Sequence, residues 1–350
     1  MPREIVTTDG RSFRFREYEL APLGPSEVRV RISFAAPKHG TEAHLIAGSS
    51  LAQKRFDPEL RLFLPTPRPA EPPGPPAERG IGNIVVGTVA EAGEGAKRFR
   101  AGDRVFGYAG IREVHQAREE EWYSAELLND EEAVCVDPAH VALVAVRDGN
   151  IRVGDTVAVF GLGAIGLMTA RIAMASGAYR VFAVDPMANR RACAEAAGAD
   201  LALDPTMGDV ALEIKRATAK KGVDVSIETS GNARALHEAI RCIRQCGTVV
   251  HVPWGPSSCA ELHLDEEFHL NRPTLIGSQA WSGWHNPDRS FPLWDHDRAY
   301  KAAIDLFRLR RASAQGIVTP VVPFDEAPEA LGRLFLNPGE AIKLGVRLGS

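Results

Sequence analysis

Apolar and polar positions follow two different patterns along the chain. From residue 1 to about residue 140, short segments alternate apolar and charged side chains with period two, as residues 27–34 (EVRVRISF) do. This pattern is typical of half-buried strands. From residue 141, apolar β-branched runs alternate with helical segments, which predicts a doubly wound parallel sheet, and short elements return near residue 294. Beyond residue 140 we expect helices at 141–147, 187–197, 208–219, 232–245 and 297–310, and strands at 157–160, 180–184, 202–203, 223–228, 247–252, 274–277, 316–323 and 342–348.

Two segments depart from these patterns. Residues 49–79 are rich in proline and have no apolar period, so we expect an irregular surface loop there. The segment 281–294 is aromatic and rich in turn residues. Its stacked indoles and polar neighbours suit a sugar or cyclitol ring, and interface packing is the alternative. The side chains concerned are Trp281, Trp284, His285 and Trp294.

The stretch 156–185 carries the clearest functional motif. An apolar run is followed by Gly161, Gly163 and Gly166 in the spacing G-x-G-x-x-G, then by a helical segment, and a second apolar run ends at Asp185. The glycines permit a tight turn, close approach of a pyrophosphate to the backbone, and close packing of the helix on the sheet. The N–H groups at the start of the helix then bind the pyrophosphate. The stretch therefore predicts a dinucleotide-binding fold.

Asp185 favours NAD over NADP, because a carboxylate at this position accepts hydrogen bonds from the ribose hydroxyls and repels a 2′-phosphate. Arg190 and Arg191 are the opposing signal. They could face a phosphate, and the alternative is a solvated first turn of the next helix. The residues expected to bind the cofactor are Gly161, Leu162, Gly163, Ala164, Ile165, Gly166, Asp185, Pro186, Arg190 and Thr229.

Composition narrows the class of protein. The chain has 350 residues, which is long enough for two domains, and its hydrophobic content of 45% is enough to form a large core. A net charge of −4 provides no electrostatic footprint for nucleic acid or an anionic membrane. There is no signal-peptide pattern at the start and no long apolar run, so we expect a cytoplasmic protein. The five scattered cysteines suit free thiols; Cys242 and Cys246 could share a helix face, but two ligands do not make a zinc site.

Over residues 25–350 the order and spacing of motifs resemble the medium-chain dehydrogenase/reductase superfamily, which includes zinc alcohol and polyol dehydrogenases. The resemblance implies a Rossmann NAD-binding domain at 141–293, and a GroES-like, mostly β catalytic domain formed by 1–140 and 294–350. It also implies a homodimer formed through the edge of the Rossmann sheet. The motifs that carry the resemblance are HGTEAHLIAG, GNIVVGTVAEAGEG, GDRVFGY, RVGDTVAVFGLGAIGLM, AVDPMANRR, the glycine after ETS, and RQCGTVVHV.

The chain departs from metal-dependent members of this superfamily at the positions of the zinc ligands. His39 stands where those members have a cysteine, and Asn83 and Ile84 stand where they have histidine and glutamate. A further acid of polyol-type members corresponds to Asp137. The segment 108–130 has no cysteine, so the structural zinc lobe is missing. Because zinc needs about three thiolate, imidazole or carboxylate ligands, we expect no metal.

An alcohol oxidation without metal still needs a group that takes the hydroxyl proton and one that orients the oxygen. His39 is suited to be the general base, and a structural histidine is the alternative. By the resemblance, Thr41 and His44 match a proton relay, although His44 could be only a ribose or phosphate contact. Asn83 can donate a hydrogen bond to the reacting oxygen. Asp137 could hold an imidazole tautomer or cap the helix that begins near Pro138.

These features predict an NAD-dependent, zinc-independent oxidoreductase that interconverts a secondary alcohol and a ketone on a polyhydroxylated substrate, such as a sugar, sugar derivative or cyclitol. The first alternative is a zinc-free quinone or enoyl reductase of the same superfamily, which Asp185 disfavours because such enzymes usually prefer NADPH. The second is a catalytically silent NAD-binding sensor. Retention of Thr41 and His44 argues for chemistry.

Overall fold

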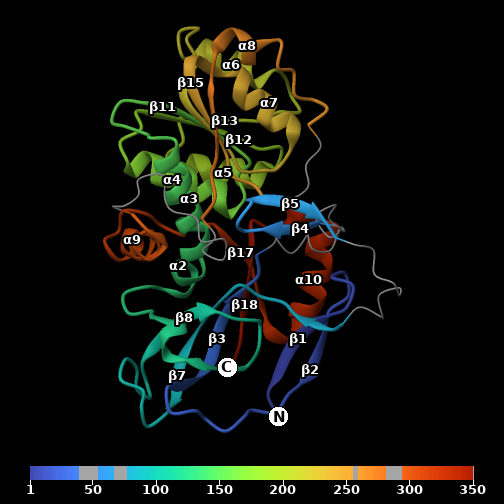
Figure 1. Ribbon diagram of the computed structural model, residues 1–350, viewed down its shortest axis with the longest axis vertical. Helices are drawn as coiled ribbons and strands as arrows, with labels where there is room; N and C mark the ends of the chain where they lie inside the picture. Colours follow the sequence, from blue (N-terminus) through green and yellow to red (C-terminus); the bar gives the residue numbers. More distant parts are fainter. Residues whose placement is uncertain (39–53, 67–76, 255–258, 281–293, 350) are drawn as a thin grey trace. The chain divides into compact units, whose positions relative to one another are not determined.

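The computed structural model describes residues 1–38, 54–66, 77–254, 259–280 and 294–349 (Figure 1). The chain forms two compact units: Met1–Val134 with Val318–Ser350, and Cys135–Ile317. The domain boundaries expected from the sequence, 140/141 and 293/294, both lie within the second unit. Helix α9 (His296–Arg308) belongs to the second unit because it packs against α3 (Val136–Asp148).

The second unit is built on a parallel sheet with the strand order β13-β12-β11-β14-β15-β16. Strand order reverses between β11 and β14, as in a doubly wound fold. Alternate strand residues, among them Phe160 and Phe182, form a buried cluster with side chains of α6 and α7. The strands are β11 (Thr156–Phe160), β12 (Arg180–Val184), β13 (Leu201–Leu203), β14 (Val223–Glu228), β15 (Ile243–His251) and β16 (Thr274–Gly277). The helices that follow α3 are α4 (Ala164–Ala175), α5 (Ala188–Ala196), α6 (Val210–Ala217), α7 (Ala233–Arg241) and α8 (Glu267–Asn271).

The first unit is mostly β-structure. Its larger sheet has the order β10-β8-β7-β3-β18-β17, with β9 also paired to β3, and a smaller sheet has the order β2-β1-β6. The period-two pattern of β3 is realised, because Val28, Val30, Ile32 and Phe34 are all buried. The strands are β1 (Arg3–Thr7), β2 (Arg14–Glu17), β3 (Glu27–Ala36), β6 (Arg79–Gly80), β7 (Ile84–Ala92), β8 (Arg104–Tyr108), β9 (Val114–Arg118), β10 (Trp122–Ser124), β17 (Val318–Pro323) and β18 (Lys343–Arg347), and the helices are α2 (Asp130–Val134) and α10 (Ala327–Leu336).

The predicted fold class, a doubly wound α/β sheet together with a mostly β domain, is confirmed. Two predicted elements are wrong in detail. Residues 49–79 are not irregular throughout, because β4 (Lys54–Asp57) and β5 (Leu62–Pro65) form an antiparallel hairpin. The expected helix 232–245 ends at Arg241, and β15 begins at Ile243, so Cys242 and Cys246 do not share a helix face.

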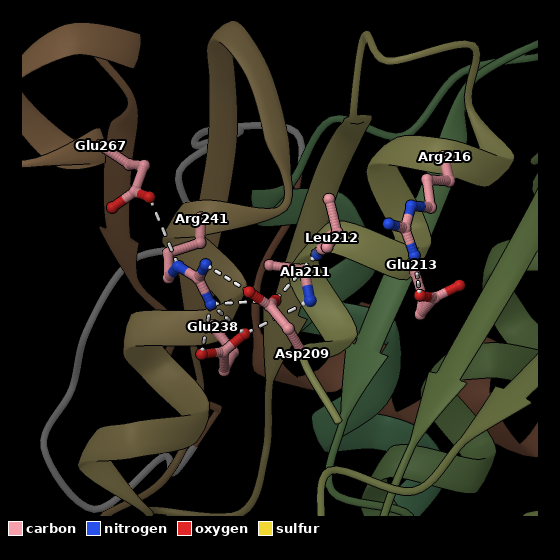
Figure 2. Close-up of polar contacts among 8 residues, drawn as sticks. All are labelled: Asp209, Ala211, Leu212, Glu213, Arg216, Glu238, Arg241 and Glu267. Atoms are coloured by element: carbon pink, nitrogen blue, oxygen red, sulfur yellow. Dashed lines mark hydrogen bonds and ion pairs between the residues drawn. The ribbon is translucent and has the colours of Figure 1, made fainter. Parts of the chain in front are cut away.

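Arg241 ties α6, α7 and α8 together (Figure 2). Its guanidinium donates to Asp209, the N-cap residue of α6, at 2.7 and 3.0 Å, and to Glu238 at 2.8 and 3.0 Å. Its Nε lies 3.4 Å from Oε1 of Glu267 on α8. The bonds to Asp209 and Glu238 raise the pKa of Arg241. One permanent positive charge therefore compensates three carboxylates, and we call this group the Arg241 network.

Candidate functional site

The three glycines of the turn after β11 have three different geometries. Gly161 has φ +86°, and a Cβ on it would lie 2.8 Å from Cβ of Ser230. A Cβ on Gly166 would lie 1.7 Å from the carbonyl oxygen of Gly161. A Cβ on Gly163 would meet no atom of the described residues within 4 Å. The fold therefore requires glycine at positions 161 and 166, whereas Gly163 leaves open space beside the backbone.

That open space lies at the start of α4. Gly163 is the N-cap residue of this helix and has no side chain to cap it. The N–H groups of the first helical turn have no partner within the helix and carry a partial positive charge. Such a helix end can bind an anion without any charged side chain, so the turn fits the pyrophosphate of a dinucleotide. Among the predicted cofactor residues, Leu162, Ala164 and Ile165 lie in this same turn and helix start.

Thr229, the residue after β14, holds the turn in place. Its backbone N–H donates to the carbonyl oxygen of Phe160 at 2.8 Å, and its hydroxyl donates to that of Gly161 at 2.7 Å. The hydroxyl proton of Thr229 is thus used by the protein, and only its lone pairs remain for a ligand. A direct contact with the cofactor stays a prediction.

Asp185 follows β12 and is 3% exposed. Its carboxylate accepts hydrogen bonds from the backbone N–H of Leu162 at 2.7 Å and of Met187 at 2.8 Å. The first bond joins the end of β12 to the glycine turn beside β11. Each carboxylate oxygen keeps a further lone pair, so Asp185 can still accept a hydrogen bond from a ligand hydroxyl. Pro186 occupies the next position along the chain.

The two arginines of α5 lie close to Asp185, and neither belongs to a freely solvated turn. Arg191 donates to the carbonyl oxygen of Asp185 at 2.7 Å and pairs with Asp204 at 3.0 Å, so its charge is compensated within the protein. Arg190 lies 3.6 Å from Oδ2 of Asp185, and its side chain is 20% exposed. The expectation of a solvated first turn is therefore wrong, because both side chains pack against the acidic ends of neighbouring strands.

The predicted catalytic residues are only partly described. His39, Thr41 and His44 lie outside the described residues. Asn83 precedes β7 in the first unit, is half-buried, and accepts a backbone hydrogen bond from Ala109 at 3.1 Å. Asp137 lies in the second unit and is 5% exposed. Because these two residues belong to different units, their grouping into one site stays a prediction.

The alternative that Asp137 caps a helix is wrong. Helix α3 begins at Val136, and Cys135 occupies its N-cap position, so Asp137 lies inside the first turn. An acid there interacts favourably with the positive end of the helix dipole. The role of holding an imidazole tautomer stays a prediction.

The aromatic segment 281–294 is described only at its last residue, and Trp281, Trp284 and His285 lie outside the described part. The guanidinium carbons of Arg147 and Arg298 lie 3.6 and 4.5 Å from the ring centroid of Trp294. Trp294 is therefore engaged in cation–π packing within the second unit. For this residue both a sugar platform and interface packing stay predictions.

One group among the described residues has the spacing of metal ligands. His237, Glu266 and Glu267 offer ligand atoms that all lie within 4.8 Å of one another. The guanidinium of Arg241, 3.4 Å from Glu267, disfavours a cation there. The sequence motifs indicate none of these three residues.

No helix of the described residues combines the length and apolar character that a membrane span requires.

Sequence reasoning missed a pair of polar residues at the carboxyl end of the parallel sheet. Glu228 ends β14 and His251 ends β15, and the register of the sheet places them opposite each other. Nδ1 of His251 lies 3.0 Å from Oε2 of Glu228, which is completely buried. The available signal was a polar residue at the end of each of two apolar strands.

Comparison with known proteins agrees with this architecture. Residues 164–292 match the family described as "Zinc-binding dehydrogenase". The D-guloside 3-dehydrogenase of Escherichia coli (strain K12) is 36% identical over 357 aligned residues, which cover 98% of this chain and 99% of the relative. The (R,R)-butanediol dehydrogenase of Bacillus subtilis (strain 168) is 29% identical, with coverage of 73% and 78%. The crystal structure of 2R,3R-butanediol dehydrogenase from Bacillus subtilis superposes with a TM-score of 0.76 at 25% identity, covering 99% of both chains. The chain belongs to the zinc-binding dehydrogenase family of medium-chain oxidoreductases.

Proposed function

We propose that this protein is an NAD-dependent dehydrogenase that interconverts a secondary alcohol and a ketone on a polyhydroxylated, sugar-like substrate, without a catalytic zinc ion. The observation that carries the proposal is the open backbone at Gly163 joined to the buried carboxylate of Asp185 through Leu162. The family and the D-guloside 3-dehydrogenase relative support the substrate class.

The preference for NAD rests on the fixed position of Asp185. Two backbone N–H groups hold the carboxylate, so it cannot swing away from a 2′-phosphate. Arg190 at 3.6 Å offsets part of that repulsion. We therefore expect the affinity for NAD to exceed that for NADP by at least about tenfold, which corresponds to about 1.4 kcal/mol.

The proposal that no zinc ion takes part in the reaction is based on the side chains at the expected ligand positions. Ile84 is completely buried and presents only an alkyl side chain, and Asn83 offers an amide, a poor zinc ligand. The described residues at these positions therefore do not fit a catalytic zinc site, and we derive no step through a metal.

The bound dinucleotide would supply the acceptor for hydride from the alcohol carbon. The chain's own residues must then remove the hydroxyl proton. His39 is the proposed base, Thr41 and His44 relay the proton, and Asn83 orients the oxygen. The peptide N–H groups at the start of α4 and the carboxylate of Asp185 hold the two ends of the adenosine diphosphate.

The proposal is tested by a dehydrogenase screen across sugars and polyols with NAD and NADP, using metal-stripped protein. We expect turnover with NAD and at least about tenfold higher affinity for NAD than for NADP. Asp185→Asn removes the charge while keeping the shape of the side chain, and it should narrow that gap. Glu195→Gln changes an exposed acid on α5 and should leave the preference unaltered. Activity that returns only with stoichiometric zinc, or equal affinity for both cofactors, would contradict the proposal.

A further inference from the structure

Glu228 and His251 form a closely spaced polar pair at the carboxyl end of the sheet. Oε1 of Glu228 accepts hydrogen bonds from the backbone N–H groups of Ser230 at 2.5 Å and Gly231 at 2.9 Å, and from the Ser230 hydroxyl. Its Oε2 faces Nδ1 of His251 at 3.0 Å. Within the described part of the chain, neither of these two atoms has a hydrogen-bonding partner of good geometry, so their 3.0 Å contact is an electrostatic one.

This geometry assigns the tautomer of His251. A carboxylate oxygen and an unprotonated ring nitrogen at 3.0 Å would present lone pairs to each other. The carboxylate therefore favours the tautomer with the proton on Nδ1, and this tautomer leaves Nε2 as an acceptor. The side chain of His251 is 29% exposed, whereas that of Glu228 is 0% exposed. The imidazole is the part of the pair that a ligand can reach.

The position of the pair indicates which ligand. A doubly wound sheet binds a dinucleotide across the point where the strand order reverses, with one nucleotide over each half. In this sheet the reversal lies between β11 and β14. Asp185, which follows β12, marks the adenosine half, so the second nucleotide lies over β14 and β15, the strands that end in Glu228 and His251. The pair also adjoins the glycine turn, since Glu228 holds Ser230, the residue against which Gly161 packs.

We propose that His251 binds the nicotinamide half of the cofactor, with Nε2 accepting a hydrogen bond from the nicotinamide ribose or from the carboxamide N–H. Glu228 is a positioning residue, because it fixes the tautomer that leaves Nε2 free to accept. This inference rests on the proposed function, since it assumes that the dinucleotide is bound at the glycine turn.

The test compares the binding of three probes, NAD⁺, ADP-ribose and AMP, by calorimetry. His251→Ala should weaken NAD⁺ about three- to tenfold, the range for losing one hydrogen bond, and leave AMP unchanged. Glu228→Gln places an amide N–H against Nδ1, which moves the ring proton to Nε2, so it should weaken NAD⁺ similarly. If ADP-ribose is weakened as much as NAD⁺, the contact is to the ribose; if ADP-ribose is unchanged, it is to the carboxamide.

His269→Ala, which changes an exposed histidine on α8, is the control and should alter none of the three affinities. Thermal unfolding confirms that each variant is folded. If Glu228→Gln does not fold, His251→Ala alone tests whether His251 contacts the cofactor. Unchanged affinity of His251→Ala for NAD⁺, or an equal loss for AMP, would overturn this inference and leave the proposed function standing. A native protein that binds neither NAD⁺ nor AMP would overturn both.

Discussion

Two alanine substitutions in one glycine motif should have opposite consequences. Gly163→Ala adds a methyl group that has no neighbour within 4 Å in the described part of the chain, whereas Gly166→Ala adds one 1.7 Å from a backbone oxygen. We therefore expect Gly163→Ala to fold normally and bind NAD poorly, because the methyl group occupies the space of the pyrophosphate. Gly166→Ala should instead damage the fold itself.

The structure sets the size of each effect. In Gly166→Ala the clash is with the backbone carbonyl group of Gly161 and the hydroxyl of Thr229. Helix α4 must therefore shift, and overpacking of this kind costs about 3 kcal/mol. For a unit of this size that corresponds to a decrease of about 6–12 °C in Tm. In Gly163→Ala only the N-cap preference is lost, about 0.5–1 kcal/mol, or about 1–4 °C. Its NADH affinity should nevertheless fall at least about tenfold.

Thermal unfolding followed by circular dichroism measures the first quantity, and NADH fluorescence titration measures the second. Unfolding should be recorded without cofactor, so that loss of binding does not lower Tm indirectly. Normal NADH affinity of Gly163→Ala, or an unfolding temperature of Gly166→Ala equal to that of the native protein, would contradict these expectations.

Two further predictions concern stability. Burial and neighbouring Arg112 lower the pKa of His115 from 6.5 to about 4, so its protonation favours the unfolded chain. The contribution of neutral His115 to the free energy of unfolding should be complete above pH 6.5 and should be lost as the pH falls towards 4. The total loss is roughly 3 kcal/mol. His115→Gln should flatten this part of the Tm–pH curve. Arg241→Ala leaves the carboxylates of the Arg241 network uncompensated, and it should lower the free energy of unfolding in urea by about 1–2 kcal/mol after solvent screening. Arg216→Ala breaks an exposed pair in Figure 2 and should lower it by less than about 0.5 kcal/mol. Equal effects of the two arginine substitutions, or a Tm–pH curve that His115→Gln leaves unchanged, would contradict these predictions.

The sheet of the second unit could be predicted from the sequence because its central strands β11, β12 and β14 are buried on both faces and are rich in apolar residues. The end of α7 could not. Residues 242–246 contain no glycine or proline that would stop a helix, and Cys242 is only the C-cap residue. Pairing with β14 makes Ile243 a strand residue, and a register shift in that pairing leaves Cys246 with φ +56°. Long-range pairing therefore overrides the local helical pattern.

The hairpin in the proline-rich segment was missed for a different reason. Its strands are short and largely exposed, so they have no apolar period. What holds them is local: Asp57 accepts the N–H groups of Glu59 and Leu60, and the rings of Phe56 and Phe63 lie 5.2 Å apart across the strands. The acid before Pro58 was a turn signal that composition obscured.

Functional residues that belong to a local motif could also be predicted from the sequence, whereas those that depend on long-range pairing could not. The glycines, Asp185 and Thr229 could be found because each occupies a fixed place in a motif that is continuous or nearly so. His251 gains its meaning only from Glu228, and the two meet because parallel strands of matched register end at the same edge of the sheet. A sequence pattern does not specify register, but it does show where apolar strands end. A polar residue that ends each of two adjacent parallel strands therefore marks a possible pair, and in a doubly wound sheet that pair lies at the edge where ligands bind.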